Sequence, residues 1–434
     1  MTPVPPEVTV PPTTIAMTDV SLAARRLQAA TPSRQAARTI GAADAAVAVS
    51  LAAIAAYCVW LGTGLAGHIP LLLDVKSDDV WFEADVMRVF ANMTDRFSDH
   101  FRSQVHPLFS LCAYGLFKLF AAMPGISKLT AVRLTIASSA AMWVCAFFSL
   151  LRVLGCRRLD TVVFSMVAAT SASAFFWTTI PETYLFSSLT IVLVLLVTAY
   201  AQRRPIPAWL DVGVAAAALS MLVTNWMFAL ISLAARHRLR VAIQLAANAF
   251  VVVVLLWAVQ KFFFPSAHFF LGDHEKWPHV KALTVPPIFF LDTMVMPDFI
   301  SIPNDHDWLW TKLSVQGVLS WRLTWAGPIA LAAWSVLLFA GAWAMTALKG
   351  LGTFRLVLAS SIACQLALHA FYGNESFLYA LNWLPLLVTV AALSSLTRLR
   401  WVGLTAACIF VLSAGFHNFK ALDLALHALI VKAS

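Results

Sequence analysis

The side chains best suited to chemistry lie in one polar stretch of an otherwise apolar chain, residues 73–106. Its seven carboxylates are Asp74, Asp78, Asp79, Glu83, Asp85, Asp95 and Asp99. Carboxylates are costly close to a bilayer, so their presence there indicates a function. A carboxylate can accept the proton of a hydroxyl group as that group attacks an electrophile. We therefore predict that Asp78 and Asp79 are catalytic, and that Glu83 and Asp85 bind substrate beside them.

The apolar residues of this stretch follow a helical period. They are Phe82, Val86, Val89, Phe90, Met93 and Phe97. This spacing predicts an amphipathic helix over residues 77–96, lying at the membrane surface with Asp78 and Asp79 at its start. A purely structural alternative exists for the two acids, because carboxylates at a helix start cap the backbone and complement the helix dipole.

Two basic side chains close the polar stretch. Arg102 and His106 are four residues apart, which places them on one face if the segment is helical. A pair of cations at headgroup depth suits a lipid phosphate, whereas a single interfacial histidine is more often a simple hydrogen-bonded residue. A divalent metal, Mg or Mn, held by Asp78, His106 and Glu182 is a third interpretation.

Five further candidates for substrate binding lie outside this stretch. Glu182 and Tyr184 belong to a short turn between apolar runs, in the sequence PETYLF. Glu375 and Tyr379 belong to a second such turn, YGNESFLY. Asn225 interrupts a third apolar run, where a polar residue can line a buried site or cap a half-helix. Solvated loop tips and interfacial aromatic residues would account for the two turns without any function.

The rest of the chain predicts an all-α, polytopic membrane protein. Hydrophobic residues make up 60% of the 434 residues, charged residues make up 12%, and the mean hydropathy is +0.80. Nine apolar runs have the length of a membrane span, at residues 45–65, 130–151, 161–179, 184–201, 241–263, 323–346, 354–371, 377–396 and 401–416. Residues 208–235 are expected to form two half-helices that meet near residues 224–226, giving about eleven membrane segments. Residues 107–123 are expected to lie in the outer interface or to re-enter from it.

Charge orients these segments. Sixteen of the 30 basic residues and five of the 21 acidic residues fall in the short loops on one side, which we assign to the cytoplasm. This assignment predicts a disordered cytoplasmic tail at residues 1–44 and a membrane domain at residues 45–434. Two large loops, residues 66–129 and 264–322, then face the periplasm. The formal charge of +9 is spread over the ends of apolar runs, so we expect no nucleic-acid partner.

Four short motifs, in this order, resemble the GT-C glycosyltransferases that use polyprenyl-phosphate sugars, in the aminoarabinose-transferase and protein-mannosyltransferase-like branch. SDDVWF (residues 77–82) resembles that branch's Asp-Glu-x-x-Tyr start, and HPLF (106–109) resembles its Lys/His-Pro-Pro-Leu motif. RVLGCRR (152–158) is similar to its arginine-rich inner turn, and residues 181–182 occupy the place of its Arg-Pro-Asp tip. The pair of short helices at residues 208–235 matches it too.

The resemblance implies a GT-C fold with Asp78 as the catalytic carboxylate, Asp79 beside it, and His106 in contact with lipid phosphate. The expected reaction is inverting transfer of a sugar from a polyprenyl-phosphate donor to a hydroxyl acceptor, which is a glycan, a lipid or a protein. The enzyme would sit in a bacterial inner membrane with its active site in the periplasm. The alternative is a transporter or flippase for a lipid-linked or small polar solute, which would use the broken helices.

Overall fold

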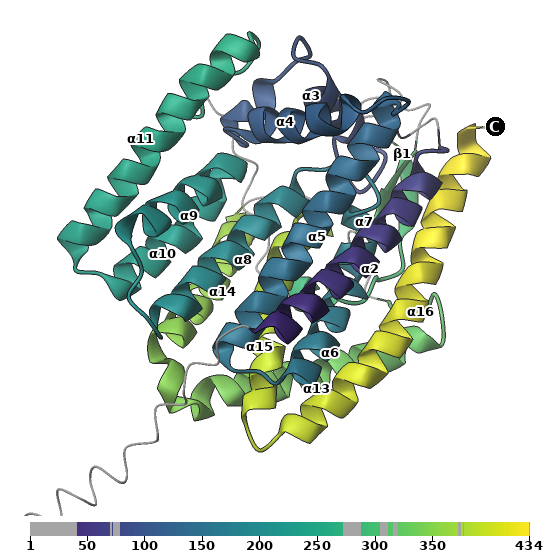
Figure 1. Cartoon of the computed structure of the whole chain (residues 1–434). Helices are drawn as coiled ribbons and strands as arrows, with labels where there is room; N and C mark the ends of the chain where they lie inside the picture. The colour runs from purple at the N-terminus through teal and green to yellow at the C-terminus, as the bar shows by residue number, and fades with distance from the viewer. Residues whose placement is uncertain are drawn as a thin grey trace, which may run out of the picture. The chain divides into compact units, whose positions relative to one another are not determined.

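The computed structural model is predominantly helical (Figure 1) and describes residues 41–69, 72, 79–271, 288–303, 311–315, 320–371, 375 and 377–433. The α-helices are α2 (Ala42–Ala66), α3 (Val86–Thr94), α4 (Phe109–Ala121), α5 (Lys128–Leu154), α6 (Arg158–Ala169), α7 (Ala172–Trp177), α8 (Tyr184–Ala201), α9 (Ala208–Met221), α10 (Trp226–Arg236), α11 (Leu239–Phe263), α12 (Phe289–Asp292), α13 (Ala326–Ala347), α14 (Gly352–Phe371), α15 (Ala380–Leu393) and α16 (Arg400–Ala433). Short 3₁₀ helices occupy Phe101–Gln104, Val223–Asn225, Lys349–Leu351, Phe377–Tyr379 and Ser394–Leu396. Strands β1 (Ile300–Pro303) and β2 (Thr311–Ser314) pair antiparallel, with Ile300 opposite Ser314.

Eight of the described helices are long and apolar enough to cross a membrane. They correspond to eight of the nine full spans expected from the sequence, so the all-α, multi-pass class is confirmed. The ninth expected span, residues 161–179, is wrong as a single helix. It is divided into α6 and α7, which are 12 and 6 residues long.

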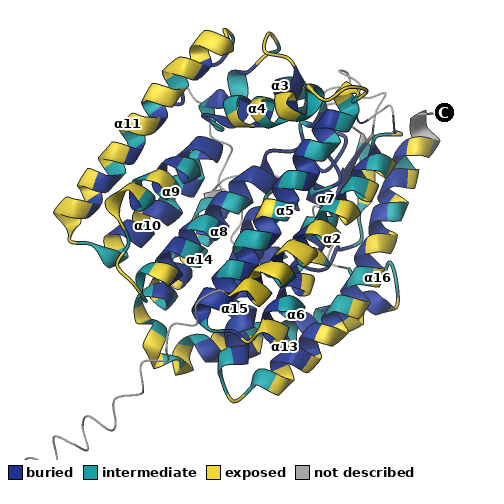
Figure 2. Ribbon diagram, in the orientation of Figure 1, coloured by how far each residue is buried: buried dark blue, intermediate teal, exposed yellow. Residues whose placement is uncertain are grey.

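Burial follows the position of each helix in the bundle (Figure 2). In the span Phe377–Leu396, which contains α15, 89% of an apolar 18-residue stretch is buried. In α2 only 17% of such a stretch is buried. Figure 2 shows α2, α11 and α16 with exposed residues recurring along their length, and α8 and α15 dark with buried residues. An exposed apolar helix surface of this extent is typical of contact with lipid, because lipid tails are as apolar as the side chains.

The division between α6 and α7 is stabilised by a distant segment. Ser171 caps α7, because its Oγ accepts a hydrogen bond from the amide of Ala174 at 3.1 Å. The next two free amides of α7, those of Ala172 and Ser173, donate to the carbonyls of Met294 and Thr293, both at 3.0 Å. The backbone groups exposed by the break therefore find partners inside the protein, as an apolar environment requires.

A second broken helix lies where the sequence predicted it. Helices α9 and α10 are 14 and 11 residues long and are joined through the 3₁₀ turn Val223–Asn225. At 1.5 Å per residue they are about 21 Å and about 17 Å long, which is shorter than the hydrocarbon core of a bilayer, about 30 Å. The prediction of two half-helices is confirmed.

Helix α4 lies across the ends of neighbouring helices, whereas α5 and α8 run through the bundle (Figure 1). Helix α3 packs against it. The start of α4 is held by Gln260 of α11, whose side-chain amide donates to the Pro107 carbonyl at 2.6 Å and accepts from the Leu111 amide at 3.1 Å. We call this end of the bundle the α4 end.

Three acids at helix starts form buried ion pairs with arginines. The pairs are Asp44 with Arg152 at 2.9 Å and with Arg158 at 2.8 Å, Asp160 with Arg400 at 2.7 Å, and Asp211 with Arg236. Each acid lies in the first turn of α2, α6 or α9, where the helix dipole favours a negative charge. All of these acids and arginines belong to the sixteen basic and five acidic residues that the sequence places in the short loops on one side.

Candidate active site

The turn that carries Asp79 is backbone-strained. Asp79, Phe82 and Glu83 have φ angles of 69°, 49° and 62°, in the left-handed region that favours glycine. Each such residue costs roughly 1–2 kcal/mol relative to an ordinary conformation. The turn is closed by hydrogen bonds from the Glu83 amide to the Asp79 carbonyl and from the Ala84 amide to the Trp81 carbonyl. The expected helix over residues 77–96 is therefore wrong at residues 79–85, because α3 begins only at Val86.

Asp79 is consequently not a helix cap, and the structural alternative for it is also wrong. Asp78, the other predicted catalytic residue, lies outside the described residues. Phe97, expected on the buried face of the same helix, follows its end and is 68% exposed.

Packing and strand β2 hold the strained turn in place. Trp81 and Phe82 are fully buried, and their rings make edge contacts with each other at 5.5 Å between centroids. The Phe82 ring also contacts Phe377 at 5.4 Å. The amide of Leu313 in β2 donates to the Val80 carbonyl at 2.9 Å. The turn is therefore fixed against segments that are far away in the sequence, which is how strain persists in a folded protein.

Asp85 holds two arginines in one cluster. Its Oδ2 lies 2.9 Å from Arg88 Nη1 and 3.2 Å from Arg102 Nη2. The guanidinium groups of both arginines also lie over the ring of Phe101, at 4.8 Å and 5.4 Å from its centroid. Asp85 thus brings two guanidinium groups together beside one aromatic ring. Arg88 is absent from the residues selected from the sequence, although its spacing of three from Asp85 in a helix was a usable signal.

His106 is buried, and its surroundings disfavour the charge that the predicted pair of cations requires. Its Nδ1 lies 2.8 Å from the carbonyl of Met221, which only accepts, so Nδ1 carries the proton. Its Nε2 lies 3.3 Å from Thr183 Oγ1. Burial, assisted by the charge of Arg102, lowers the pKa of His106 from 6.5 to about 4. Arg88 is a cation next to Arg102, since both contact Asp85 and the ring of Phe101.

Glu182 is buried beside His106, with 5% of its surface exposed. Its Oε1 accepts hydrogen bonds from the amide and the hydroxyl of Thr183, at 2.7 Å and 2.9 Å. Burial raises the pKa of Glu182 from 4.5 to about 7, and the negative charge of Asp85 acts in the same direction. Thr183 thus connects Glu182 to His106, and it too is absent from the sequence-based selection.

The tip of the α9–α10 pair fixes the segment that carries His106. The Leu108 amide donates to the Ser220 carbonyl at 2.8 Å, and the Val223 amide donates to the Val105 carbonyl at 3.0 Å. Together with the bond from His106 to Met221, these contacts satisfy backbone groups that the broken helix leaves unpaired.

Asn225 has a structural role in this tip. Its side chain makes no capping hydrogen bond. Instead, its amide nitrogen donates to the Ser187 carbonyl at 2.9 Å and lies 3.4 Å from Thr190 Oγ1, both in α8. Asn225 therefore ties the tip of the broken helix to α8.

Aromatic contacts connect the two predicted turns. The ring of Tyr184 lies 6.5 Å from that of His106 and 5.8 Å from that of Tyr379. Tyr379 in turn stacks near the buried His369 at 4.7 Å. Tyr184 and Tyr379, selected independently from the sequence, therefore lie in contact.

Glu375 is connected to the strained turn through strand β2. Glu375 is 1% exposed, and its Oε2 accepts a hydrogen bond from Ser314 at 2.7 Å. Burial raises the pKa of Glu375 to about 7, with the nearby charge of Glu83 adding to this effect. Lys312, two residues before Ser314 and so on the same face of the strand, lies 3.5 Å from Glu83. The predicted substrate-binding residues Glu83 and Glu375 are thereby brought to neighbouring positions.

The described residues do not form a metal site. Within them no group of three or more His, Cys, Asp or Glu side chains is arranged to hold an ion. Of the proposed ligands, His106 has both ring nitrogens directed at protein groups, and Glu182 Oε1 already accepts two hydrogen bonds. The remaining proposed ligand, Asp78, lies outside the described residues.

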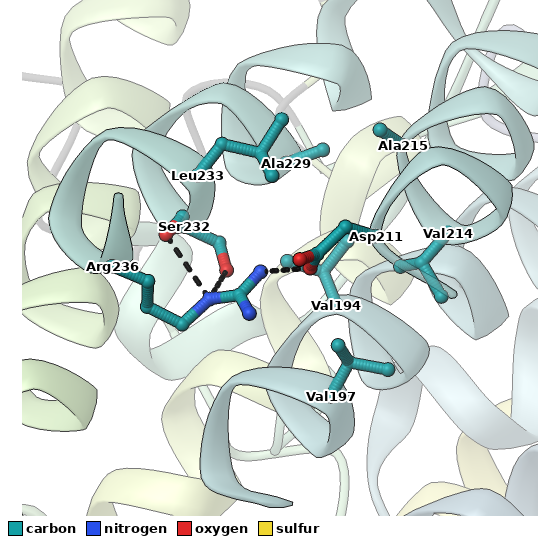
Figure 3. Close-up of a pocket in the computed structure, with 9 residues that line it drawn as sticks. All are labelled: Val194, Val197, Asp211, Val214, Ala215, Ala229, Ser232, Leu233 and Arg236. Carbon is teal, nitrogen blue, oxygen red and sulfur yellow. Dashed lines mark hydrogen bonds and ion pairs between the residues drawn. The ribbon is translucent and has the colours of Figure 1, made fainter. Parts of the chain in front are cut away.

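One small cavity in the described part of the chain lies away from these acids (Figure 3). It is lined by Asp211, Ser232 and Arg236 together with apolar side chains of α8, α9 and α10, and it has room for about one water molecule. In Figure 3 the Arg236 guanidinium points at both Ser232 and Asp211. His237 also contacts Asp211, at 3.0 Å. This cavity contains none of the candidate residues.

Comparison with known protein families, with curated proteins and with solved structures found no match to this chain.

Proposed function

We propose that this protein is a membrane glycosyltransferase that moves a sugar from a polyprenyl-phosphate donor to a hydroxyl acceptor on the periplasmic side of a bacterial inner membrane. The observation that carries the proposal is the convergence of acids from separate segments at the α4 end. Asp85, Glu182 and Glu375 come from three parts of the chain and are all buried or partly buried there. Unlike the three structural acids paired with arginines, Glu182 and Glu375 are bonded to hydroxyl groups, and burying such acids is costly.

The proposed reaction assigns a task to the carboxylates and to the arginines. The acceptor oxygen attacks the anomeric carbon from the face opposite the phosphate, and Asp78 or Asp79 accepts its proton. The bond between the anomeric carbon and the phosphate oxygen breaks, and polyprenyl phosphate leaves with the electron pair. Arg88 and Arg102 are positioned to stabilise that negative charge, because guanidinium groups bind phosphate well. The configuration at the anomeric carbon is inverted by this single displacement.

The strained turn supports this assignment. Three left-handed residues in a row of five are maintained by the packing of Trp81 and Phe82 and by β2. Strain of this kind is concentrated at functional sites, where it fixes a group in a geometry that an ordinary turn would not provide. Here the group so fixed is Asp79.

The transporter alternative has less support. It relied on the broken helices and on Asn225, and the exposed backbone groups of both breaks are bonded to other segments of the protein. Asn225 itself is engaged by α8. These helices therefore offer a solute few free polar groups at the described positions.

The direct test is a transfer assay on purified protein in lipid nanodiscs. Candidate polyprenyl-phosphate sugars are supplied with a hydroxyl acceptor, and the release of free polyprenyl phosphate is measured. We expect Asp78→Asn and Asp79→Asn to abolish release while leaving thermal unfolding unchanged. Asp99→Asn is the matched control, because Asp99 is an exposed acid of the same loop. Full activity in both single variants would exclude these residues as the base.

A further inference from the structure

Two buried polar atoms near the strained turn lack a hydrogen-bond partner within the described residues: the indole nitrogen Nε1 of Trp81 and the carboxyl oxygen Oε1 of Glu375. Both side chains are almost completely buried, with 0% and 1% of their surfaces exposed. The amides of Val315 and Phe377 lie close to the Glu375 carboxyl and partly offset the rise in its pKa. A buried donor or acceptor without a partner is unfavourable, and native proteins contain few of them. Each therefore requires an explanation.

Strand β2 brings the two side chains into one neighbourhood. Leu313 forms a backbone bridge with Trp81, and the next residue, Ser314, donates a hydrogen bond to the other oxygen of Glu375. The ring of Phe82 contacts the rings of both Trp81 and Phe377, and Phe377 is two residues from Glu375. Trp81 is thus part of an aromatic cluster with Phe82 and Phe377, and Glu375 lies two residues from Phe377.

The pair has the chemistry of a hydroxyl-binding site. Trp81 Nε1 can only donate a hydrogen bond, and an ionised Glu375 can only accept one. A hydroxyl group does both at once. Apolar ring faces beside such a pair suit the C–H faces of a sugar. They supply no positive charge that could neutralise a phosphate or a second carboxylate.

We infer that Trp81 and Glu375 bind a hydroxyl group of a neutral sugar, with Ser314 holding the Glu375 carboxyl in position. This inference rests on the proposed function for its role, because transfer involves two molecules that carry hydroxyl groups. The same chemistry is offered by the sugar of the donor and by a glycan acceptor, and kinetics distinguishes them.

Binding is tested first without any reaction. Purified protein in nanodiscs is titrated with a panel of methyl glycosides, and contact is detected by saturation-transfer difference NMR. At least one methyl glycoside should give a signal, and its per-O-methylated counterpart, which has no hydroxyl donor, should give none. Trp81→Phe and Glu375→Gln should each weaken binding about tenfold, the loss expected for one hydrogen bond to a buried partner.

The controls separate this inference from misfolding. Trp226→Phe removes another buried indole N–H without a partner, on the α9–α10 tip, and should leave binding unchanged. Ser314→Ala provides a second, smaller change at the site and should weaken binding through Glu375 alone. Equal binding by wild type, Trp81→Phe and Glu375→Gln would overturn the inference. So would equal binding of the permethylated sugar, or no signal from any glycoside of the panel.

The transfer assay assigns the ligand. A rise in the KM of the acceptor alone places the acceptor sugar at Trp81 and Glu375, and a rise in the KM of the donor alone places the donor sugar there. If glycosides bind as expected but no donor releases polyprenyl phosphate, the sugar site stands and the proposed function fails. If release is normal but Trp81→Phe and Glu375→Gln leave both KM values unchanged, the proposed function stands and the sugar site fails.

Discussion

Replacing Glu182 by Gln should change how the stability of this protein depends on pH. Glu182 and His106 are buried next to each other and are linked through Thr183, and both are displaced from their ordinary pKa values. The pKa of Glu182 is raised from 4.5 to about 7, and that of His106 is lowered from 6.5 to about 4. Glutamine keeps the shape of the side chain and removes the titration.

The two shifts have opposite consequences for stability. Because burial raises the pKa of Glu182, its contribution to stability is fully present below pH 4.5 and is lost as the pH rises to about 7. Because burial lowers the pKa of His106, its contribution is present above pH 6.5 and is lost as the pH falls to about 4. Each displacement corresponds to about 3 kcal/mol at 1.36 kcal/mol per pKa unit. Between pH 4.5 and 6.5 the two effects largely cancel in the wild-type protein.

Glu182→Gln removes the pH-dependent contribution of Glu182 and leaves that of His106. The variant should match the wild type near pH 4.5, where Glu182 is uncharged, and should become more stable than it by up to about 3 kcal/mol as the pH rises past 7. His106→Gln should become more stable than the wild type as the pH falls from 6.5 to 4. Thermal unfolding midpoints in nanodiscs, measured for all three proteins across this range, provide the comparison.

Difference infrared spectroscopy identifies the titrating group directly. The carboxylic acid C=O band that disappears near pH 7 should lose intensity in Glu182→Gln and, separately, in Glu375→Gln, because burial raises the pKa of Glu375 to about 7 as well. A constant difference in midpoint between Glu182→Gln and wild type from pH 4.5 to 7.5 would refute the assignment of a buried, titrating carboxyl to Glu182.

Three further changes test other parts of the structure. Asp79→Gly should abolish transfer and should leave the protein more stable than Asp79→Ala by about 1 kcal/mol, because glycine accepts the left-handed backbone without strain; equal unfolding midpoints of the two variants would contradict the strain. Asp211→Asn should cost about 3 kcal/mol by leaving Arg236 buried without its partner, whereas Asp423→Asn, in an exposed ion pair, should cost less than about 1 kcal/mol; unfolding midpoints compare the two. Asn225→Ala should cost about 1–3 kcal/mol by freeing the Ser187 carbonyl, and an unchanged midpoint would show that this bond contributes little.

Local sequence patterns predicted the elements that depend on local physics. Apolar length alone located eight membrane-length helices, because a span must satisfy its own backbone and present apolar side chains throughout. The break between α9 and α10 was predicted from charge, because a single span would place Arg236, Arg238 and Arg240 on the side opposite the other basic loops. The break between α6 and α7 was not, because Thr170 and Ser171 are common within helices. That break depends on Thr293 and Met294, more than a hundred residues away.

The candidate site shows the same limit. The predicted topology put the segments of His106 and Glu182 at the same end of the helices. In the structure the two residues lie close together, linked through Thr183. The lowered pKa of His106 was not visible in the sequence, since burial is a property of the folded surroundings and not of the HPLF motif. The helix expected from residue 77 was wrong because its apolar residues are explained equally well by a turn whose rings are buried in the core. Asp79 therefore lies in a left-handed turn, a conformation that no pattern of side chains indicates.

The bonds between the α9–α10 tip and residues 105–108 impose an order on biogenesis. Residues 105–108 leave the ribosome more than a hundred residues before Ser220, Met221 and Val223, which pair with them. Until that later hairpin inserts, the peptide groups around His106 must remain hydrated outside the bilayer or be sheltered by the translocation machinery. Ribosome-stalled chains ending before residue 208 should accordingly leave this segment open to cleavage by added protease, and chains stalled well beyond residue 260 should protect it.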